Sequence, residues 1–186
     1  GKSMMPVGLT KFLTRGELLD LVRFVSELGK PGAYAVRPQA TIQRWRVLAQ
    51  PPAELTADVP HLEHLRAFVL NAPAEQWRSV YGTVSGVLPL NELRAAREPT
   101  VVILVGEVQV NEPGRVEVEI TCTERTQVWV DEASFENQRR FETELAQGRH
   151  QIVVRVEISG QENPELKLEL IRPVGSTVQL EVIGGQ

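Results

Sequence analysis

Two closely spaced histidines are the first residues whose types and spacing could do chemistry. His61 and His64 flank Glu63 in a stretch with helical spacing, so their imidazoles could share one helix face and hold a metal ion. No third ligand follows nearby, and the alternative is a pair of solvated surface histidines. His150 follows Gly148 in a predicted hairpin, where hydrogen bonding to a turn is the simpler interpretation than a role as a base.

Carboxylates and nucleophiles form no catalytic set. Glu107, Glu112, Glu117 and Glu119 lie on predicted strands, and any sheet with alternating glutamates offers the carboxylate spacing of about 5 Å that a retaining glycosidase needs. The chain has neither a G-x-S-x-G elbow nor a P-loop. We therefore expect no enzymatic activity from this chain.

A tryptophan on a strand is the better ligand candidate, and the chain has three: Trp45, Trp77 and Trp129. Trp129 has the opposite parity to Val128 and Val130, and Asp131 shares its face about 7 Å along the strand. An outward ring could stack on a sugar while the carboxylate accepts from its hydroxyls. The alternative is that Trp129 packs under the following loop or in a second layer.

The elements that must position these residues are β-strands. Apolar residues recur with a period of two in RVEVEITCT (115–123), TQVWVD (126–131) and GRHQIVVRVEI (148–158), and again around residues 166–170 and 178–182. This pattern predicts one apolar face inward and one polar face outward. We expect a mostly β fold, a jelly-roll-like antiparallel β-sandwich with an N-terminal amphipathic helix, and a core that includes Val118, Ile120, Val130, Val154 and Leu168.

Composition limits the class of protein further. The 186 residues carry a net charge of −4, and no segment concentrates Lys or Arg, which argues against nucleic-acid binding. No run of about 18 apolar residues predicts a membrane span. The single cysteine, Cys122, excludes an internal disulfide, and its parity predicts a buried position.

The N-terminal segment predicts a helix over residues 15–28. Thr14 and Glu17 form a capping box, Leu18, Leu21, Val25 and Leu28 follow at helical spacing, and glycine and proline come after them. Such an apolar stripe must pack on something, either the sandwich or a partner.

The same segment resembles the C-terminal end of the haem-binding (cytochrome c-like) domains of large planctomycete and verrucomicrobial proteins. The motif is S-x-M-P-x-G-L followed by L-T-x-x-E-L-x-D-L-V-x-F-x-x-x-L-G, in which the matching positions include Ser3, Met5, Pro6, Gly8, Leu13, Thr14, Glu17, Asp20, Phe24 and Gly29. The resemblance implies Met5 as an axial haem ligand in the full-length protein, with Met4 a weaker candidate. This chain lacks C-x-x-C-H, so we expect no haem here, although haem c is possible in a longer protein.

A second resemblance is to PA14-like and carbohydrate-binding-module-like β-sandwiches. It covers Val128 to Asp131 and the L-x-x-G-x-H hairpin at Leu145, Gly148 and His150.

These resemblances lead to three expected parts and a set of functional hypotheses. Residues 1–30 would be the end of a cytochrome c-like domain, 31–100 a connector with short helices and first strands, and 101–186 the main strands, with 31–186 as one domain. We expect a non-catalytic module of a periplasmic or extracellular haem-containing, dehydrogenase-like protein, which binds polysaccharide or docks the upstream domains of the same chain. The alternatives are an electron-transfer unit that shields the haem and, third, a hydrolase.

Overall fold

The computed structural model describes residues 14–27, 39–48, 51–56, 59–93, 100–159 and 162–183. The chain divides into two compact units, residues 1–38 and residues 39–186. The second unit begins later than residue 31, where the sequence placed its start. Strands from residues 39–89 pair with strands from residues 100–182, so no domain boundary lies near residue 100.

The first unit contains helix α1 (Arg15–Glu27), which confirms the predicted amphipathic helix up to its last residue. Its capping box is formed: Thr14 N donates to Glu17 Oε2 at 2.7 Å, and Glu17 N donates to Thr14 Oγ1 at 3.3 Å. The predicted final residue, Leu28, lies outside the described residues. None of the residues of α1 is buried.

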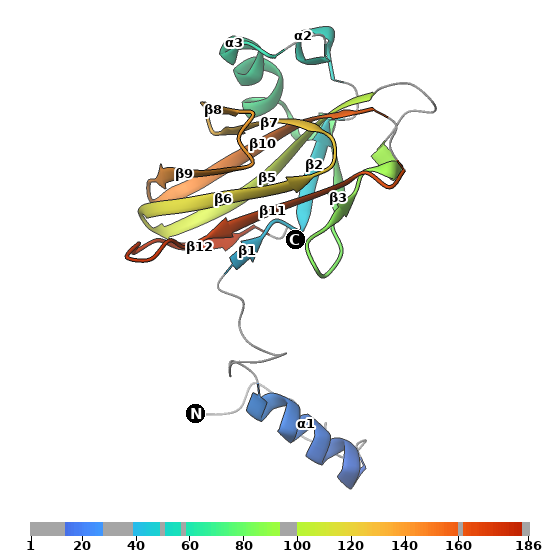
Figure 1. The fold of residues 1–186 in the computed structure, drawn as a ribbon, viewed down its shortest axis with the longest axis vertical. Helices are drawn as coiled ribbons and strands as arrows, with labels where there is room; N and C mark the ends of the chain where they lie inside the picture. Colours follow the sequence, from blue (N-terminus) through green and yellow to red (C-terminus); the bar gives the residue numbers. More distant parts are fainter. Residues whose placement is uncertain are drawn as a thin grey trace. The chain divides into compact units, whose positions relative to one another are not determined.

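The second unit is an antiparallel β-sandwich, as the alternation predicted (Figure 1). Sheet A has the order β1-β11-β6-β9, with β4 paired to β11. Sheet B has the order β3-β2-β5-β10-β7-β8, with β12 paired to β5. The strands of sheet A are β1 (Gln39–Thr41), β4 (Leu88–Pro89), β6 (Gly114–Cys122), β9 (Arg140–Leu145) and β11 (Glu165–Ile171). Those of sheet B are β2 (Arg44–Leu48), β3 (Trp77–Tyr81), β5 (Thr100–Glu112), β7 (Arg125–Val130), β8 (Ala133–Glu136), β10 (Gly148–Ile158) and β12 (Gln179–Val182).

The connections cross repeatedly between the sheets. From β5 to β12, successive strands alternate between sheet B and sheet A, except that β7 and β8 form a hairpin within sheet B. The longest pairing joins β5 to β10 over the whole length of β10, from Gly148 opposite Val110 to Ile158 opposite Thr100. The sandwich is therefore organised around two strands that are remote in sequence.

The main core lies between the sheets and confirms the predicted inward face. All five residues predicted to be core are buried: Val118, Ile120, Val130, Val154 and Leu168. Cys122 is buried among them, also as predicted. Gly106 on β5 faces this core, where a Cβ would lie 2.6 Å from Ile42 Cδ1 and 3.4 Å from Trp45 Cζ3. Only a glycine lets these two large side chains cover β5 there.

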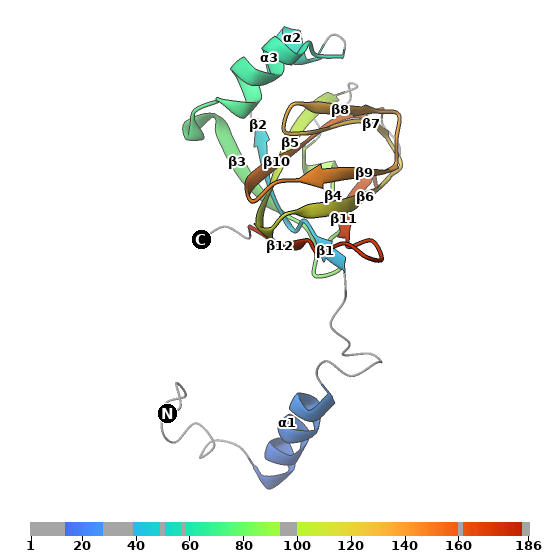
Figure 2. The ribbon, with the colours of Figure 1, turned by 90° about the vertical axis from the view of Figure 1, so that its left-hand side faces the viewer.

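A helical layer covers part of the outer face of sheet B (Figure 2). It consists of α2 (Ala53–Thr56), α3 (Leu62–Leu65) and the helical turn η2 (Arg66–Leu70); two further short turns are η3 (Ala74–Gln76) and η4 (Asn91–Leu93). Leu55, Leu65 and Val69 of this layer pack on outward side chains of the sheet, among them Val153. Sheet B is thus buried on both faces beneath this layer, so the prediction of a polar outer face is wrong there.

Candidate binding surface on the outer face of sheet B

Trp129 lies on the outer face of sheet B, as its parity predicted, but its predicted exposure is wrong. It is 3% exposed, because it belongs to a buried cluster that the helical layer covers. The same cluster includes Leu48, Ile103 and Val105 of sheet B. A ring covered in this way cannot stack on a sugar. The second-layer alternative is the one that the structure supports.

Asp131 is engaged within the protein. It follows β7 in a turn with φ of 52°, a backbone conformation that aspartate tolerates better than most residues. Its Oδ1 accepts the Gln151 N–H at 2.9 Å, and its Oδ2 lies 2.7 Å from His150 Nδ1. His150 Nε2 in turn lies 2.8 Å from the Ala146 carbonyl oxygen. Asp131 and His150 therefore fasten the β7–β8 turn to the start of β10, and neither is placed beside a stacking ring.

The structure does not bring the other predicted site residues together into one site. Met5 lies outside the described residues. The rings of His61 and His64 are 5.9 Å apart between centroids, at the start of the helical layer, and His64 also contacts Phe68. Within the described ranges, no group of three His, Cys, Asp or Glu side chains could hold a metal ion.

A buried arginine on β10 fixes where the helical layer sits. Arg155 is 2% exposed; its Nε donates to the Leu55 carbonyl oxygen at 3.0 Å and its Nη2 to the Thr56 carbonyl oxygen at 2.9 Å. Its Nη1 donates to Gln127 Oε1 at 3.3 Å and to Glu157 Oε1. The guanidinium therefore satisfies the last carbonyl groups of α2, a position that favours a cation.

The layer has a second, exposed attachment. Arg66 on η2 forms a two-pronged pair with Glu132 after β7, with both nitrogen–oxygen distances at 2.6 Å. Hydrogen bonds from this guanidinium lower the pKa of the Glu132 carboxyl. The helical layer packs over Val105, Val153 and Trp129, which lie in one cross-strand row of sheet B.

Three arginines also lie on this outer face. Arg46 on β2 is opposite Val105, in the same row as Trp129; Arg44 lies in the next row and Arg149 on β10 in the row after that. Arg46 Nη2 is 2.5 Å from Glu107 Oε1 and its guanidinium lies over the Trp77 ring at 5.2 Å, while Arg149 Nη1 is 4.0 Å from Glu107 Oε2. We call Arg44, Arg46 and Arg149 the arginine strip.

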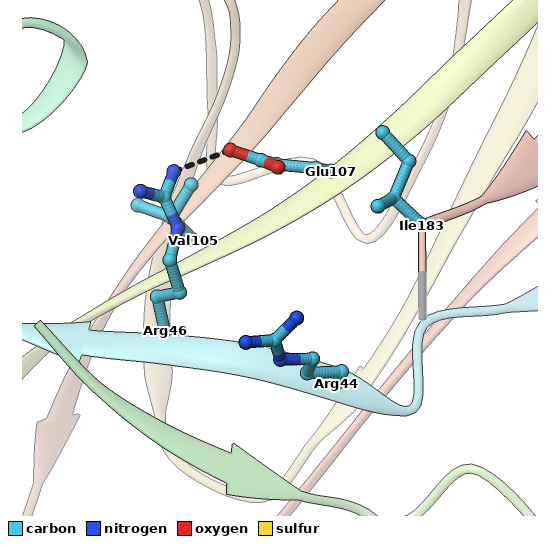
Figure 3. A pocket seen from close by; sticks show the side chains of 5 residues that line it. All are labelled: Arg44, Arg46, Val105, Glu107 and Ile183. Carbon is cyan, nitrogen blue, oxygen red and sulfur yellow. Dashed lines mark hydrogen bonds and ion pairs between the residues drawn. The ribbon is translucent and has the colours of Figure 1, made fainter. Parts of the chain in front are cut away.

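Figure 3 shows a small notch in the strip, with Arg44 and Arg46 rising from β2 and Glu107 and Ile183 across from them. It forms where β2 and β12 both approach the same edge of β5: Arg46 is opposite Val105, and Ile183 N donates to the Glu107 carbonyl oxygen at 2.9 Å. Its volume of about 20 Å³ admits roughly one water-sized group. A ligand would lie across this surface and would not enter it.

A second hollow of about 350 Å³ lies between β3 and β4, at the open edge of the sandwich. Its apolar lining includes Val80, Leu88 and Leu93, and its charged lining is Arg78 and Glu92. Its size is within the range of small-molecule sites, but its charged groups include only one of each sign and form no chemical constellation.

What the arginine strip can do is bind, because guanidinium groups donate hydrogen bonds and cannot act as bases at neutral pH. Sequence reasoning missed the strip, although the signal is present in Arg44-Trp45-Arg46, where two arginines flank a buried tryptophan at strand spacing. The long apolar run of Val101–Val105 likewise signalled a strand buried on both faces.

Comparisons of the chain with protein-family models, with curated proteins and with solved structures return no match. Among the described residues, no helix is both long and apolar enough to cross a membrane.

Proposed function

We propose that this chain is a non-catalytic β-sandwich module of a larger exported haem-containing, dehydrogenase-like protein, and that it docks the preceding domain of the same polypeptide through α1. The observation that carries the proposal is the apolar face of α1, a helix in which no residue is buried. Leu18, Leu21, Val22 and Val25 fall on one side of this helix, and all four are exposed.

A short amphipathic helix is normally stabilised by packing its apolar face against another surface. Isolated helices shorter than about 12–15 residues are marginal in water, and α1 has 13 residues. Its N-terminus nevertheless has the capping box of Thr14 and Glu17, so the sequence specifies where the helix starts. Covering the apolar face would supply the stabilisation that capping alone does not.

The preceding domain is the proposed cover because the α1 segment resembles the last helix of cytochrome c-like domains. In those domains a final amphipathic helix packs over the haem fold. The residues of this chain do not themselves fit covalent haem: its one cysteine, Cys122, is buried in the sandwich core and has no histidine neighbour in sequence. Any haem would therefore belong to the preceding domain.

The test is binding between this chain and that preceding domain, produced as a separate polypeptide and measured by isothermal titration calorimetry. Leu21→Glu places a charge on the apolar face and should abolish the binding. Arg23→Glu, on the polar side of the same helix, is the matched control and should leave it intact.

Two results would overturn the proposal. One is an absence of binding by the unmodified chain. The other is a dimer of this chain, detected by analytical ultracentrifugation and lost in Leu21→Glu, because the apolar face would then belong to a second copy.

A further inference from the structure

In the arginine strip, three guanidinium groups share one paired carboxylate among the described residues. Glu107 pairs with Arg46 and Arg149, and Glu181 lies on the same face opposite Gln109. Arg44 forms no ion pair with any described residue; its one hydrogen bond runs from Nη2 to Ser79 Oγ at 3.0 Å. A half-buried guanidinium without a carboxylate leaves strong, directional donors available to an anion.

Unpartnered polar atoms also concentrate on this face. Within the described part of the chain, six buried side-chain nitrogen or oxygen atoms have no hydrogen-bond partner. Four of the six belong to residues on the outer face of β2, β3 and β10: Arg44 Nε, Arg46 Nε, Trp77 Nε1 and Gln151 Oε1. Buried polar atoms are normally paired, so these unpaired donors and acceptors could form hydrogen bonds with a ligand. Turning either guanidinium toward a ligand breaks no hydrogen bond at its Nε.

The shape of the face selects an extended ligand. The notch admits roughly one oxygen atom, whereas the Arg149 side chain beside Glu107 is 64% exposed. Tyr81 stands opposite Arg44 in register and is 64% exposed, so an aromatic ring lies one strand from the unpaired guanidinium. The row from Tyr81 through Arg44 and Glu107 to Gln151 crosses four strands, a span of roughly 14 Å at about 4.8 Å per strand.

The available groups are those that recognise an acidic sugar. β2 is paired on both sides, to β3 and β5, so an extended peptide cannot add to it through backbone hydrogen bonds. What remains are side chains: guanidinium groups for a carboxylate, the Ser79 hydroxyl and amide side chains for hydroxyls, and the Tyr81 ring for the apolar face of a sugar. Three arginines on a protein of net charge −4 are too few for a nucleic-acid backbone.

We propose that the arginine strip binds a carboxylate-bearing polysaccharide, with Arg44 pairing with the carboxylate and Tyr81 stacking on a sugar ring. This site is independent of α1 and of Trp129. It lies on the outer face of sheet B, where Arg46 pairs with Glu107 and Arg44 donates to Ser79.

The test is titration of the whole chain with oligogalacturonate, followed by NMR amide shifts and calorimetry, with neutral dextran oligosaccharides as the comparison. Shifts should map to β2, β3 and the start of β10. Arg44→Gln should weaken binding about tenfold, which corresponds to the loss of one charge-assisted hydrogen bond. Tyr81→Ala should also weaken it, whereas Arg66→Gln, an arginine on the helical layer that pairs with Glu132, should not.

Each other outcome overturns the proposal. Equal binding by Arg44→Gln and the unmodified chain would remove Arg44 from the site. Equal binding of dextran would show that carboxylates are not read, and tighter binding of polyglutamate would make an acidic peptide the ligand. No shift at millimolar oligogalacturonate would mean that the strip binds no acidic glycan. Arg44 and Tyr81 are not in the core, so thermal melts of both variants should match the unmodified chain and separate lost binding from lost folding.

Discussion

Replacing Arg155 with alanine should loosen the helical layer from sheet B. Arg155 on β10 bonds to α2, to Gln127 on β7 and to Glu157 on its own strand. Its removal would leave the Leu55 and Thr56 carbonyl groups, together with Gln127 Oε1, without their donor in a buried setting. Each unsatisfied buried group costs on the order of 1–3 kcal/mol.

The total should nevertheless stay near the low end of the range for a broken buried pair, which is about 3–5 kcal/mol. Glu157 would not be stranded, since its side chain is 34% exposed and Arg125 Nη1 is 3.6 Å away. The α2 carbonyl groups could also reach water if this short helix unwinds. We therefore expect the free energy of unfolding to fall by about 3 kcal/mol.

Urea denaturation followed by tryptophan fluorescence measures that loss, and hydrogen exchange locates it. Protection should fall more at residues 62–70 than in β6, because the helical layer opens before the sandwich. Arg155→Lys keeps the charge but cannot reach all four acceptors, so it should give a smaller loss. Arg125→Ala is the matched control: Arg125 pairs with the same Glu157 but is 63% exposed, and its removal should cost no more than about 1 kcal/mol.

The reasoning is refuted if Arg155→Ala leaves the urea midpoint unchanged. It is equally refuted if Arg125→Ala costs as much as Arg155→Ala, because the effect would then come from neutralising Glu157 and not from the bonds to α2.

Three further predictions concern other parts of the chain. Gly106→Ala should destabilise the sandwich by about 1–3 kcal/mol through overpacking against Ile42, and adding Ile42→Val, which removes Cδ1, should recover part of the loss in thermal melts; full additivity would contradict the clash. Burial raises the pKa of the Cys122 thiol, so Ellman's reagent at pH 8 should react with it only in denaturant, and rapid labelling of the native protein would show that the core is open. Backbone and side-chain hydrogen bonds from Thr14 lower the pKa of Glu17, so the capped form of α1 is favoured above the ordinary glutamate pKa and is lost as pH falls through the lowered value. NMR shifts of the first helical turn should follow this titration. The Glu17→Gln variant should show no such pH dependence.

Sequence alternation predicted sheet A well because that sheet meets only one apolar layer. Along β6, buried Val116 and Val118 alternate with Glu117 and Glu119, and Glu117 pairs with Arg140 on the outside at 2.6 Å. A period of two is a reliable indicator where one face is wet.

Sheet B is where the sequence misled, because its outer face meets the helical layer in one part and solvent in another. Arg155 looks like a solvent-facing residue by type and parity, yet it is buried, since its partners are carbonyl groups that no sequence pattern displays. Trp129 was assigned to the correct face for the same reason that its exposure was misjudged: parity gives the face but not what covers it. The arginine strip required knowing which parts of this face are covered, which is a tertiary fact.

The pairing of β5 with β10 has a consequence for how the chain folds. Val105 and Val153 are opposite each other although 48 residues separate them in sequence (153 − 105), and the neighbours of β5 in sheet B also come from before it and from the end of the chain. These long loops must close, at a cost in chain entropy, before contacts between β5 and β10 can stabilise the fold. We therefore expect folding in milliseconds to seconds rather than microseconds. During synthesis, β5 would leave the ribosome with two apolar faces and no strand partner beyond β2 until residues 148–158 follow. The apolar strand β5 therefore lacks its main partner until most of the sandwich has been synthesised. A chaperone that binds extended apolar segments would bind the chain most strongly around residues 101–105.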